Sequence, residues 1–175
     1  MKKLVVKLDA AGLNRLVKKL EAYEKRQTEK AAILLQRLAD EGYEIVRAGF
    51  ENAIYDGSAK TEVRIDTTGE NVKAVVAAGN AVLFIEFGTG ITYPDIHPEA
   101  AENGMIRGEY GQKKGRNQKW AFYGEPGSNG IVVRETSKGK VVLTQGNPAN
   151  MPVYNAIKRL QERLPELAKE VFDSD

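Results

Sequence analysis

His97 is the only histidine in the sequence, and it is the first residue to consider for catalysis. Asp95 precedes it by two positions, and this spacing on a loop can orient an imidazole for general-base catalysis. Glu86 supplies another carboxylate, so these three residues are the candidate set for a hydrolase. No serine in a nucleophile-elbow context and no second histidine accompany them. We therefore rank a hydrolase lowest and expect His97 to form a local structural hydrogen bond in a loop.

Metal and cofactor chemistry has little support in the sequence. The chain contains no cysteine, which removes thiolate ligands, cysteine nucleophiles and disulfides. The carboxylates from Glu86 to Glu109 follow no metal-loop spacing. The Gly-Thr-Gly segment at 88–90 lacks the lysine of a phosphate loop and the third glycine of a dinucleotide fingerprint. We expect no catalytic residue, no cofactor and no metal ion.

Glu86 is the most informative residue, because it lies within an apolar run. Its apolar neighbours are Val82, Leu83, Phe84, Ile85 and Phe87. So much contiguous apolar surface is seldom left in water, and we expect these residues to be mostly buried. An unpaired carboxylate among them would be destabilising, so Glu86 needs hydrogen-bond partners. We expect it to bind the backbone N–H groups and hydroxyl of the turn at 88–90, in a structural role.

A basic, glycine-rich segment is the second candidate site. Residues 91–130 contain few aliphatic side chains and are typical of a long loop excursion. The segment carries Arg107, Lys113, Lys114, Arg116 and Lys119, interleaved with Tyr110, Trp120, Phe122 and Tyr123. Such a loop can hold a phosphate backbone without recognising its sequence. A DNA-binding module acting through 107–119 is therefore an alternative function.

A solvated loop, whose aromatic side chains dock on the domain or on a partner, is the other interpretation of that segment. Trp120 is the residue that we most expect at an interface, because indole rings fill pockets there.

Composition limits the class of protein. A chain of 175 residues suits one domain, 1–175, with the loop excursion at about 91–130. Hydrophobic residues make up 42% and charged residues 29%, which is ordinary for a globular protein. The formal net charge of +2 does not indicate a dedicated nucleic-acid binder. No apolar run approaches the roughly 18 residues of a membrane span, and the N-terminus does not match a signal peptide. We expect no membrane partner.

A long helix is predicted near the N-terminus. Alternation within 1–8 predicts a short strand, and Asp9 is a suitable N-cap for the helix that follows. Apolar residues then recur at helical spacing at Leu13, Leu16, Val17, Leu20, Tyr23, Leu34, Leu35, Leu38, Ile45, Val46 and Phe50. One helix over 10–50 and two helices that meet near 24–28 are both possible. A single helix would measure roughly 60 Å, which favours a neighbouring copy of the chain as its support.

Two hairpins are predicted from alternating apolar residues. The first joins strands at 61–66 and 72–78, with Val63 and Ile65 on one face. The second joins 131–134 and 140–144. Between the hairpins, periodicity alone leaves 82–87 open as a short helix or an extended buried run.

A closing amphipathic helix is predicted from Pro152, where a missing N–H in the first turn costs nothing. Its apolar stripe is Val153, Ile157, Leu160, Leu164, Leu167, Ala168 and Val171. Pro165 can kink this helix or divide it in two. These elements predict an α+β fold, in which a small antiparallel sheet is packed by a long N-terminal helix and a C-terminal helix.

The order of these elements resembles a family of bacteriophage proteins. The stretch at 83–89, which contains Glu86, Phe87, Gly88 and Thr89, is similar to an aromatic-Val/Ile-Glu-Phe-Gly-Thr stretch of that family. The segment at 148–153, which contains Pro148 and Pro152, is similar, less closely, to its Pro-Ala-x-Pro-Phe-like helix start. The family is the tail-component family of long-tailed phages and prophages, also described as head–tail joining, neck or tail-completion proteins.

The resemblance covers roughly residues 10–90 and 140–172 and implies a non-enzymatic virion protein. Such proteins assemble as a ring, often a hexamer, between the connector and the tail tube. The implied partners are other copies of the chain, the tail-tube protein, connector or head-completion proteins and packaged DNA. The implied location is the tail or neck of the virion, with assembly in the host cytoplasm.

Overall fold

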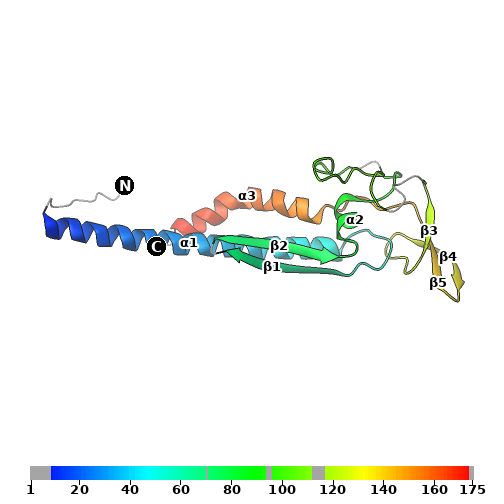
Figure 1. Cartoon of the computed structure of the whole chain (residues 1–175), viewed down its shortest axis with the longest axis horizontal. Helices are drawn as coiled ribbons and strands as arrows, with labels where there is room; N and C mark the ends of the chain where they lie inside the picture. The colour runs from blue at the N-terminus through cyan, green and yellow to red at the C-terminus, as the bar shows by residue number, and fades with distance from the viewer. Residues whose placement is uncertain (1–8, 70, 94–95, 112–116, 174–175) are drawn as a thin grey trace.

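A computed structural model describes residues 9–69, 71–93, 96–111 and 117–173 of the chain. Its elements are α1 (Ala10–Glu51), β1 (Thr61–Gly69), β2 (Val72–Gly79), α2 (Val82–Phe87), β3 (Trp120–Tyr123), β4 (Ile131–Thr136), β5 (Gly139–Thr144) and α3 (Pro152–Asp173). The molecule is elongated along α1, with α3 and the β1–β2 hairpin beside its C-terminal half and the remaining strands at the far end (Figure 1). The predicted α+β class, with its long N-terminal and C-terminal helices, is confirmed. The strand predicted within 1–8 lies outside the described residues.

Helix α1 is a single helix of 42 residues, so the possible break near 24–28 does not occur. No glycine or proline lies between Gly12 and Gly42, and most residues there are good helix formers. The predicted N-cap is also confirmed, because the Asp9 carboxylate accepts a hydrogen bond from the Gly12 backbone N–H at 2.6 Å. This bond satisfies one of the donors that a helix start leaves free.

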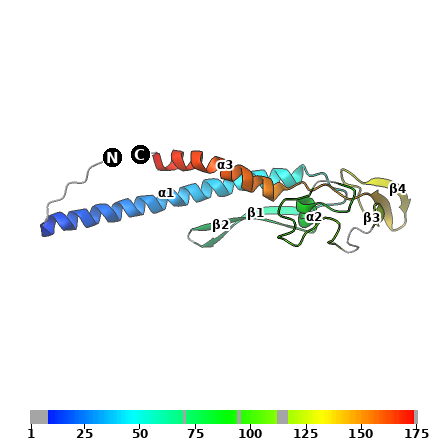
Figure 2. The same cartoon turned by 90° about the horizontal axis from the view of Figure 1, so that it is seen from above.

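The apolar stripe of α1 divides into two parts with different surroundings. In the C-terminal half, Ala39, Val46 and Phe50 are buried. In the N-terminal half, Leu13, Val17, Leu20 and Tyr23 are 47–55% exposed. Helix α3 and the β1–β2 hairpin lie along the C-terminal half only, and α1 extends well beyond both of them (Figure 2).

The first predicted hairpin is confirmed as the antiparallel β1–β2 pair. Val63 lies opposite Ala77 and Ile65 opposite Val75 in the register. Strand β1 continues to Gly69, so the turn is shorter than the predicted one at 67–71. Val63, Val75 and Ala77 pack against the main hydrophobic core.

The core forms where the three helices meet. It is built from Val46 and Phe50 of α1, Ala81 and Ile85 at α2, and Ala156 of α3. Ile85 is fully buried at its centre. These contacts join residues from three distant parts of the chain, and this junction fixes the position of α2 against both long helices.

Residues 82–87 form a short helix rather than an extended run. The prediction that this run is mostly buried is wrong for Leu83, which is 49% exposed. Successive side chains on a helix are about 100° apart, so a short helix cannot bury every residue of an apolar run on one face.

A three-stranded sheet in the order β3-β5-β4 forms the far end of the molecule. The predicted second hairpin is confirmed as β4 and β5, with Thr136 opposite Gly139 at a tighter turn. The prediction of loop throughout 91–130 is wrong at Trp120–Tyr123, which forms β3 and pairs with β5. A strand of four residues carries too short a pattern to be recognised without its partner.

Helix α3 is continuous through Pro165, so this proline does not divide it. The predicted burial of its stripe is wrong for Ile157 and Leu164, which are exposed. Ala156 is buried instead, together with Leu167 and Val171 of the predicted stripe.

A glycine in α1 sets how closely α3 approaches. A Cβ atom added at Gly49 would lie 2.6 Å from Pro152 Cβ and 3.1 Å from Pro152 Cα. We predict that Gly49→Ala lowers the free energy of unfolding by about 1–3 kcal/mol through overpacking, which outweighs the roughly 1 kcal/mol gained in helix propensity. Urea denaturation followed by circular dichroism measures this change.

Gly42→Ala is the matched control in the same helix. Its added Cβ would meet only the ends of two side chains, Leu160 Cδ1 at 3.1 Å and Val75 Cγ2 at 3.4 Å. We expect this variant to stay within about 1 kcal/mol of the wild type. A Gly49→Ala variant as stable as Gly42→Ala would contradict the tight contact with Pro152.

Candidate functional site

The Glu86 carboxylate lies in the junction between α2 and the start of α3. Its Oε2 accepts a hydrogen bond from the Val153 backbone N–H at 2.9 Å, and its Oε1 accepts one from the Tyr154 N–H at 2.9 Å. These two residues follow Pro152 in the first turn of α3, where backbone N–H groups have no partner inside the helix. A negative charge is also favourable at this end of a helix dipole. Glu86 therefore caps α3 from another element.

The expectation that Glu86 fixes the turn at 88–90 is wrong. The turn is held instead by Thr89 and Asn147, whose backbones exchange hydrogen bonds of 2.9 and 3.2 Å. Gly88 has a φ of +77°, and an added Cβ would lie 2.8 Å from the Ala149 backbone nitrogen. Glycine is required there by both its dihedral angle and this close approach. The two segments that carry the phage resemblance are thus in contact.

His97 is paired with Glu86, and both side chains are buried. The distance from His97 Nε2 to Glu86 Oε1 is 3.0 Å, and the side chains are 3% and 7% exposed. His97 Nδ1 accepts a hydrogen bond from the Glu99 backbone N–H at 3.0 Å. Because Nδ1 is an acceptor, the proton of a neutral ring is on Nε2 and is donated to Glu86. The predicted local bond of His97 is confirmed, whereas its pairing with Glu86 was not predicted.

Aromatic rings enclose the His97 imidazole. The Phe87 ring centroid is 4.5 Å from that of His97, and the Tyr154 centroid is 5.1 Å away in an edge-on arrangement. Both nitrogens of His97 and both oxygens of Glu86 have hydrogen-bond partners within the protein. Of the three candidate hydrolase residues, two are brought together, while Asp95 lies outside the described residues. The geometry of this pair is that of a buried structural network.

A second polar network lies next to this pair and was not predicted. Asn147 Nδ2 donates to Asp56 Oδ1 at 2.5 Å, and the Asp56 backbone N–H donates to Asn147 Oδ1 at 2.8 Å. The Asn147 backbone N–H also donates to Thr89 Oγ1 at 2.9 Å. The network therefore ties the segment after α1 to the turn at 88–90. Only the proximity of three separate segments creates it, so no local sequence pattern indicates it.

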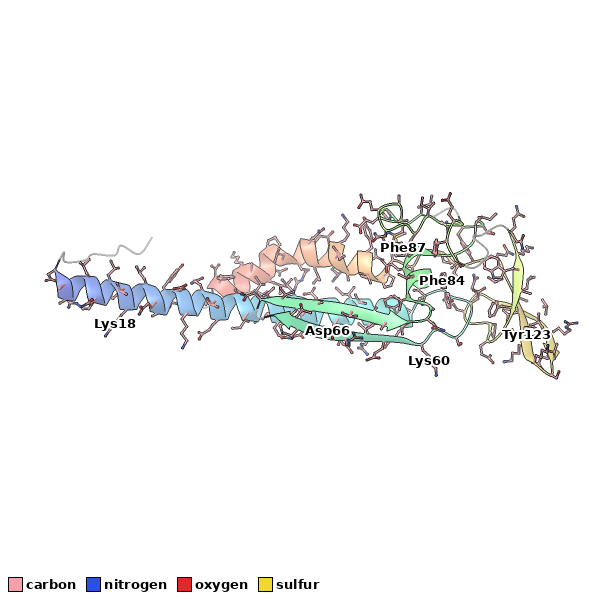
Figure 3. The ribbon with its side chains drawn as sticks, viewed as in Figure 1. Lys18, Lys60, Asp66, Phe84, Phe87 and Tyr123 are labelled. Carbon is pink, nitrogen blue, oxygen red and sulfur yellow. The ribbon has the colours of Figure 1, made fainter. Side chains whose placement is uncertain are left out.

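An aromatic cleft of about 560 Å³ opens beside Asp56 and Asn147. Its aromatic walls are Tyr55, Phe84, Tyr110, Trp120, Phe122 and Tyr123. Phe84 and Tyr110 stack at 5.9 Å between ring centroids, with 12° between their planes. Figure 3 labels two of these residues, Phe84 on α2 and Tyr123 on β3. The interface predicted for Trp120 stays a prediction, but the residue does line a cleft that can receive an apolar group.

Burial raises the pKa of Tyr110 to about 12, although the positive charge of Arg107 acts in the opposite direction. The Tyr110 hydroxyl has no hydrogen-bond partner in the described part of the chain. Its protonated form is therefore favoured by exclusion of water rather than by a specific acceptor.

The basic residues of the candidate DNA-binding loop have different surroundings. Arg107 is half-buried, and its guanidinium lies 5.6 Å from the centroid of the Tyr93 ring. Lys119 is exposed. Lys113, Lys114 and Arg116 lie outside the described residues. DNA binding through 107–119 stays a prediction.

Comparisons with protein-family models, curated proteins and solved structures found no match. The resemblance to the phage tail-component family therefore stays a prediction. Among the residues that the structure describes, no group of three or more His, Cys, Asp or Glu side chains could hold a metal ion. No described helix is long and apolar enough to cross a membrane.

The role of Glu86 can be tested by removing its carboxylate. We predict that Glu86→Ala lowers the free energy of unfolding by about 3 kcal/mol, because three donors, one buried and two part-buried, lose their acceptor. Glu86→Gln should lower it less, since one oxygen remains as an acceptor. Chemical denaturation measures both changes, and amide hydrogen exchange should accelerate at Val153 and Tyr154.

Glu99→Gln is the control, because it makes the same change on an exposed side chain of the adjoining loop. We expect its denaturation midpoint and the exchange at the start of α3 to match those of the wild type. Equal midpoints for Glu86→Ala and the wild type would refute the capping role.

The environment of Tyr110 predicts a pH dependence. An exposed tyrosine ionises near pH 10, whereas burial raises the pKa of Tyr110 in the folded protein to about 12. The unfolded chain therefore loses the proton first, and the contribution to stability is present below about pH 10 and lost towards pH 12. Absorbance titration at alkaline pH, compared with that of Tyr110→Phe, should assign the late step to Tyr110. If Tyr110→Phe instead removed a step near pH 10, the result would contradict the burial of Tyr110.

Proposed function

We propose that this protein is a non-enzymatic structural subunit of a long-tailed bacteriophage or prophage, which forms a ring at the head–tail interface or the tail end. The observation that carries the proposal is the presence of two unlike sets of exposed apolar side chains, one on the N-terminal half of α1 and one on β4. These elements lie at opposite ends of the elongated chain (Figure 1). Large apolar patches on a protein surface commonly mark sites of protein–protein contact.

The first surface is the N-terminal half of α1. Leu13, Val17, Leu20 and Tyr23 lie along it with about half of their side-chain area in contact with water. This part of the helix projects beyond α3 and the β1–β2 hairpin (Figure 2). A second chain can therefore approach it without moving another element of the fold.

The second surface is strand β4 at the other end. Its residues Ile131, Val132 and Val133 are 40–60% exposed, and β4 is an edge strand of its sheet. An exposed edge strand presents unpaired backbone N–H and C=O groups to which another strand can pair. Tyr123 on β3, the opposite edge, adds an exposed aromatic ring.

Two separate apolar surfaces allow one chain to contact more than one neighbour. Repeated contacts between copies of one chain close into a ring when the rotation between neighbours permits. The proposed neighbours are copies of this chain, with tail-tube and connector subunits above and below the ring. The order of sequence segments that resembles phage tail components favours the same function.

The chemistry of the Glu86–His97 pair also favours a structural function over hydrolysis. A general base must reach the proton of a substrate. Here the two side chains are almost entirely buried, and their polar atoms bind the start of α3 and the Glu99 backbone. This pair accordingly serves to hold the fold that presents the two surfaces.

The assembly state provides the test. We expect sedimentation velocity and native mass spectrometry to show association that grows with protein concentration, or that begins when tail-tube or connector subunits are added. Electron microscopy should then show closed rings. A strict monomer that also ignores those subunits would overturn the proposal.

A variant of β4 links the assembly to the proposed surface. Val133→Glu places a charge on an exposed apolar position, so we expect weaker assembly with an unchanged melting temperature. Glu135→Lys, which changes an already charged and exposed residue of the same strand, is the control. Equal assembly of Val133→Glu and the wild type would exclude β4 from the interface.

A further inference from the structure

We infer that the N-terminal half of α1 packs in parallel and in register against the same segment of neighbouring copies. This inference rests on the proposed ring and identifies one of its contact surfaces. The occupant is therefore a second copy of this chain, and three observations about α1 support that choice.

The first observation is the spacing of the apolar stripe, in which Leu16 is half-buried and the other members are exposed. Leu13, Leu16, Leu20 and Tyr23 are separated alternately by three and four residues, which is the repeat of helices that pack along a seam. Val17 lies beside this seam and widens it. The repeat predicts another helix, rather than a flat surface, as the partner.

The second observation is that this seam continues a helix interface already present in the fold. Lys30 follows Tyr23 by one heptad, and its Nζ contacts the Phe172 carbonyl of α3 at 3.1 Å. Further along the same seam, Arg37 pairs with Glu170 at 3.1 Å, and Glu41 pairs with Arg163 at 3.3 Å. The face that carries α3 in one half of α1 is therefore the face that is exposed in the other half.

The third observation is the charge on either side of the exposed seam. Lys19 and Glu24 are both exposed, and neither forms an ion pair within the described part of the chain. In parallel helices in register, a residue beside the seam faces the residue five positions further on in the neighbour. Lys19 of one copy would thus face Glu24 of the next.

Antiparallel pairing of the same segment is disfavoured by charge. It would place the side of the helix that carries Lys19 and Arg26 against the identical side of the partner. Like charges would then face one another along the seam. The charge pattern is therefore complementary to a parallel copy of itself.

Parallel packing is also the arrangement that a ring requires. Rotation about the axis of a ring leaves the direction of each helix along that axis unchanged, so equivalent helices run the same way. The apolar seam from Leu13 to Tyr23 is short, and isolated helices of this length are marginal in water. We therefore expect it to associate in the assembled ring rather than as an isolated pair.

Single-cysteine cross-linking tests the register, because the natural chain contains no cysteine. We expect Leu13→Cys and Leu20→Cys each to form disulfide-linked dimers on mild oxidation of the assembled full-length chain, since each would face its own equivalent. Lys18→Cys, on the same projecting helix but away from the seam, is the control and should remain unlinked (Figure 3). Dimers formed only by mixing Leu13→Cys with Tyr23→Cys would indicate antiparallel pairing and overturn the inference.

Charge reversal tests the orientation independently. In the Leu20→Cys background, we expect Lys19→Glu and Glu24→Lys each to reduce the cross-linked fraction several-fold at low salt. The double variant should restore it. Stronger cross-linking by Lys19→Glu alone, or no effect of either change, would contradict the proposed pairing.

The outcomes separate this inference from the proposed function. Rings that give no cross-link at Leu13 and Leu20 would overturn the helix pairing and leave the ring in place. Cross-linked dimers from a chain that never forms a ring would overturn the proposed ring and leave the helix pairing in place. A monomer that gives no cross-link would overturn both.

Discussion

A carboxylate buried among apolar side chains must be supplied with hydrogen-bond donors, and the whole junction of this molecule is arranged to supply Glu86 with them. Two donors are backbone N–H groups at the start of α3, and the third is the imidazole of His97. These bonds do not merely satisfy the carboxylate, because the helix start needs acceptors as much as Glu86 needs donors. Since α3 packs along α1, the capping of α3 fixes the angle at which the two long helices meet. The loop that carries His97 is held at the same point.

The polar network of Asp56, Thr89 and Asn147 reinforces this junction from the other side. It connects the end of α1, the turn after α2 and the segment before α3, and these three segments also enclose the core around Ile85. The aromatic cleft opens beside this network, so its walls are attached to the most constrained part of the fold. The junction is therefore the point from which α1 and the three-stranded sheet extend in opposite directions (Figure 1).

The sequence predicts those parts of the structure whose signals are local and repeated. The N-cap at Asp9, the two hairpins and the start of α3 at Pro152 follow from turn chemistry and periodicity, and all are confirmed. The partners of Glu86 were predicted wrongly, because the nearest donors in the sequence are at the 88–90 turn, while two of the three donors that bind it are more than sixty residues away and the third is His97. Strand β3 was missed for a related reason: it is stable only because β5 pairs with it.

The exposed half of α1 shows how a pattern can predict a helix correctly although the described part of the fold does not bury its apolar face. Its apolar spacing is regular enough to predict a helix with a buried face, yet Leu13 and Leu20 remain about half exposed. Within one chain this segment gains no packing from α3, and helices of such length have little stability by themselves. A buried face becomes possible when an equivalent helix lies alongside, and the opposite charges of Lys19 and Glu24 then meet across the seam. The proposed pairing would account for the length of α1, of which the core uses only the C-terminal half.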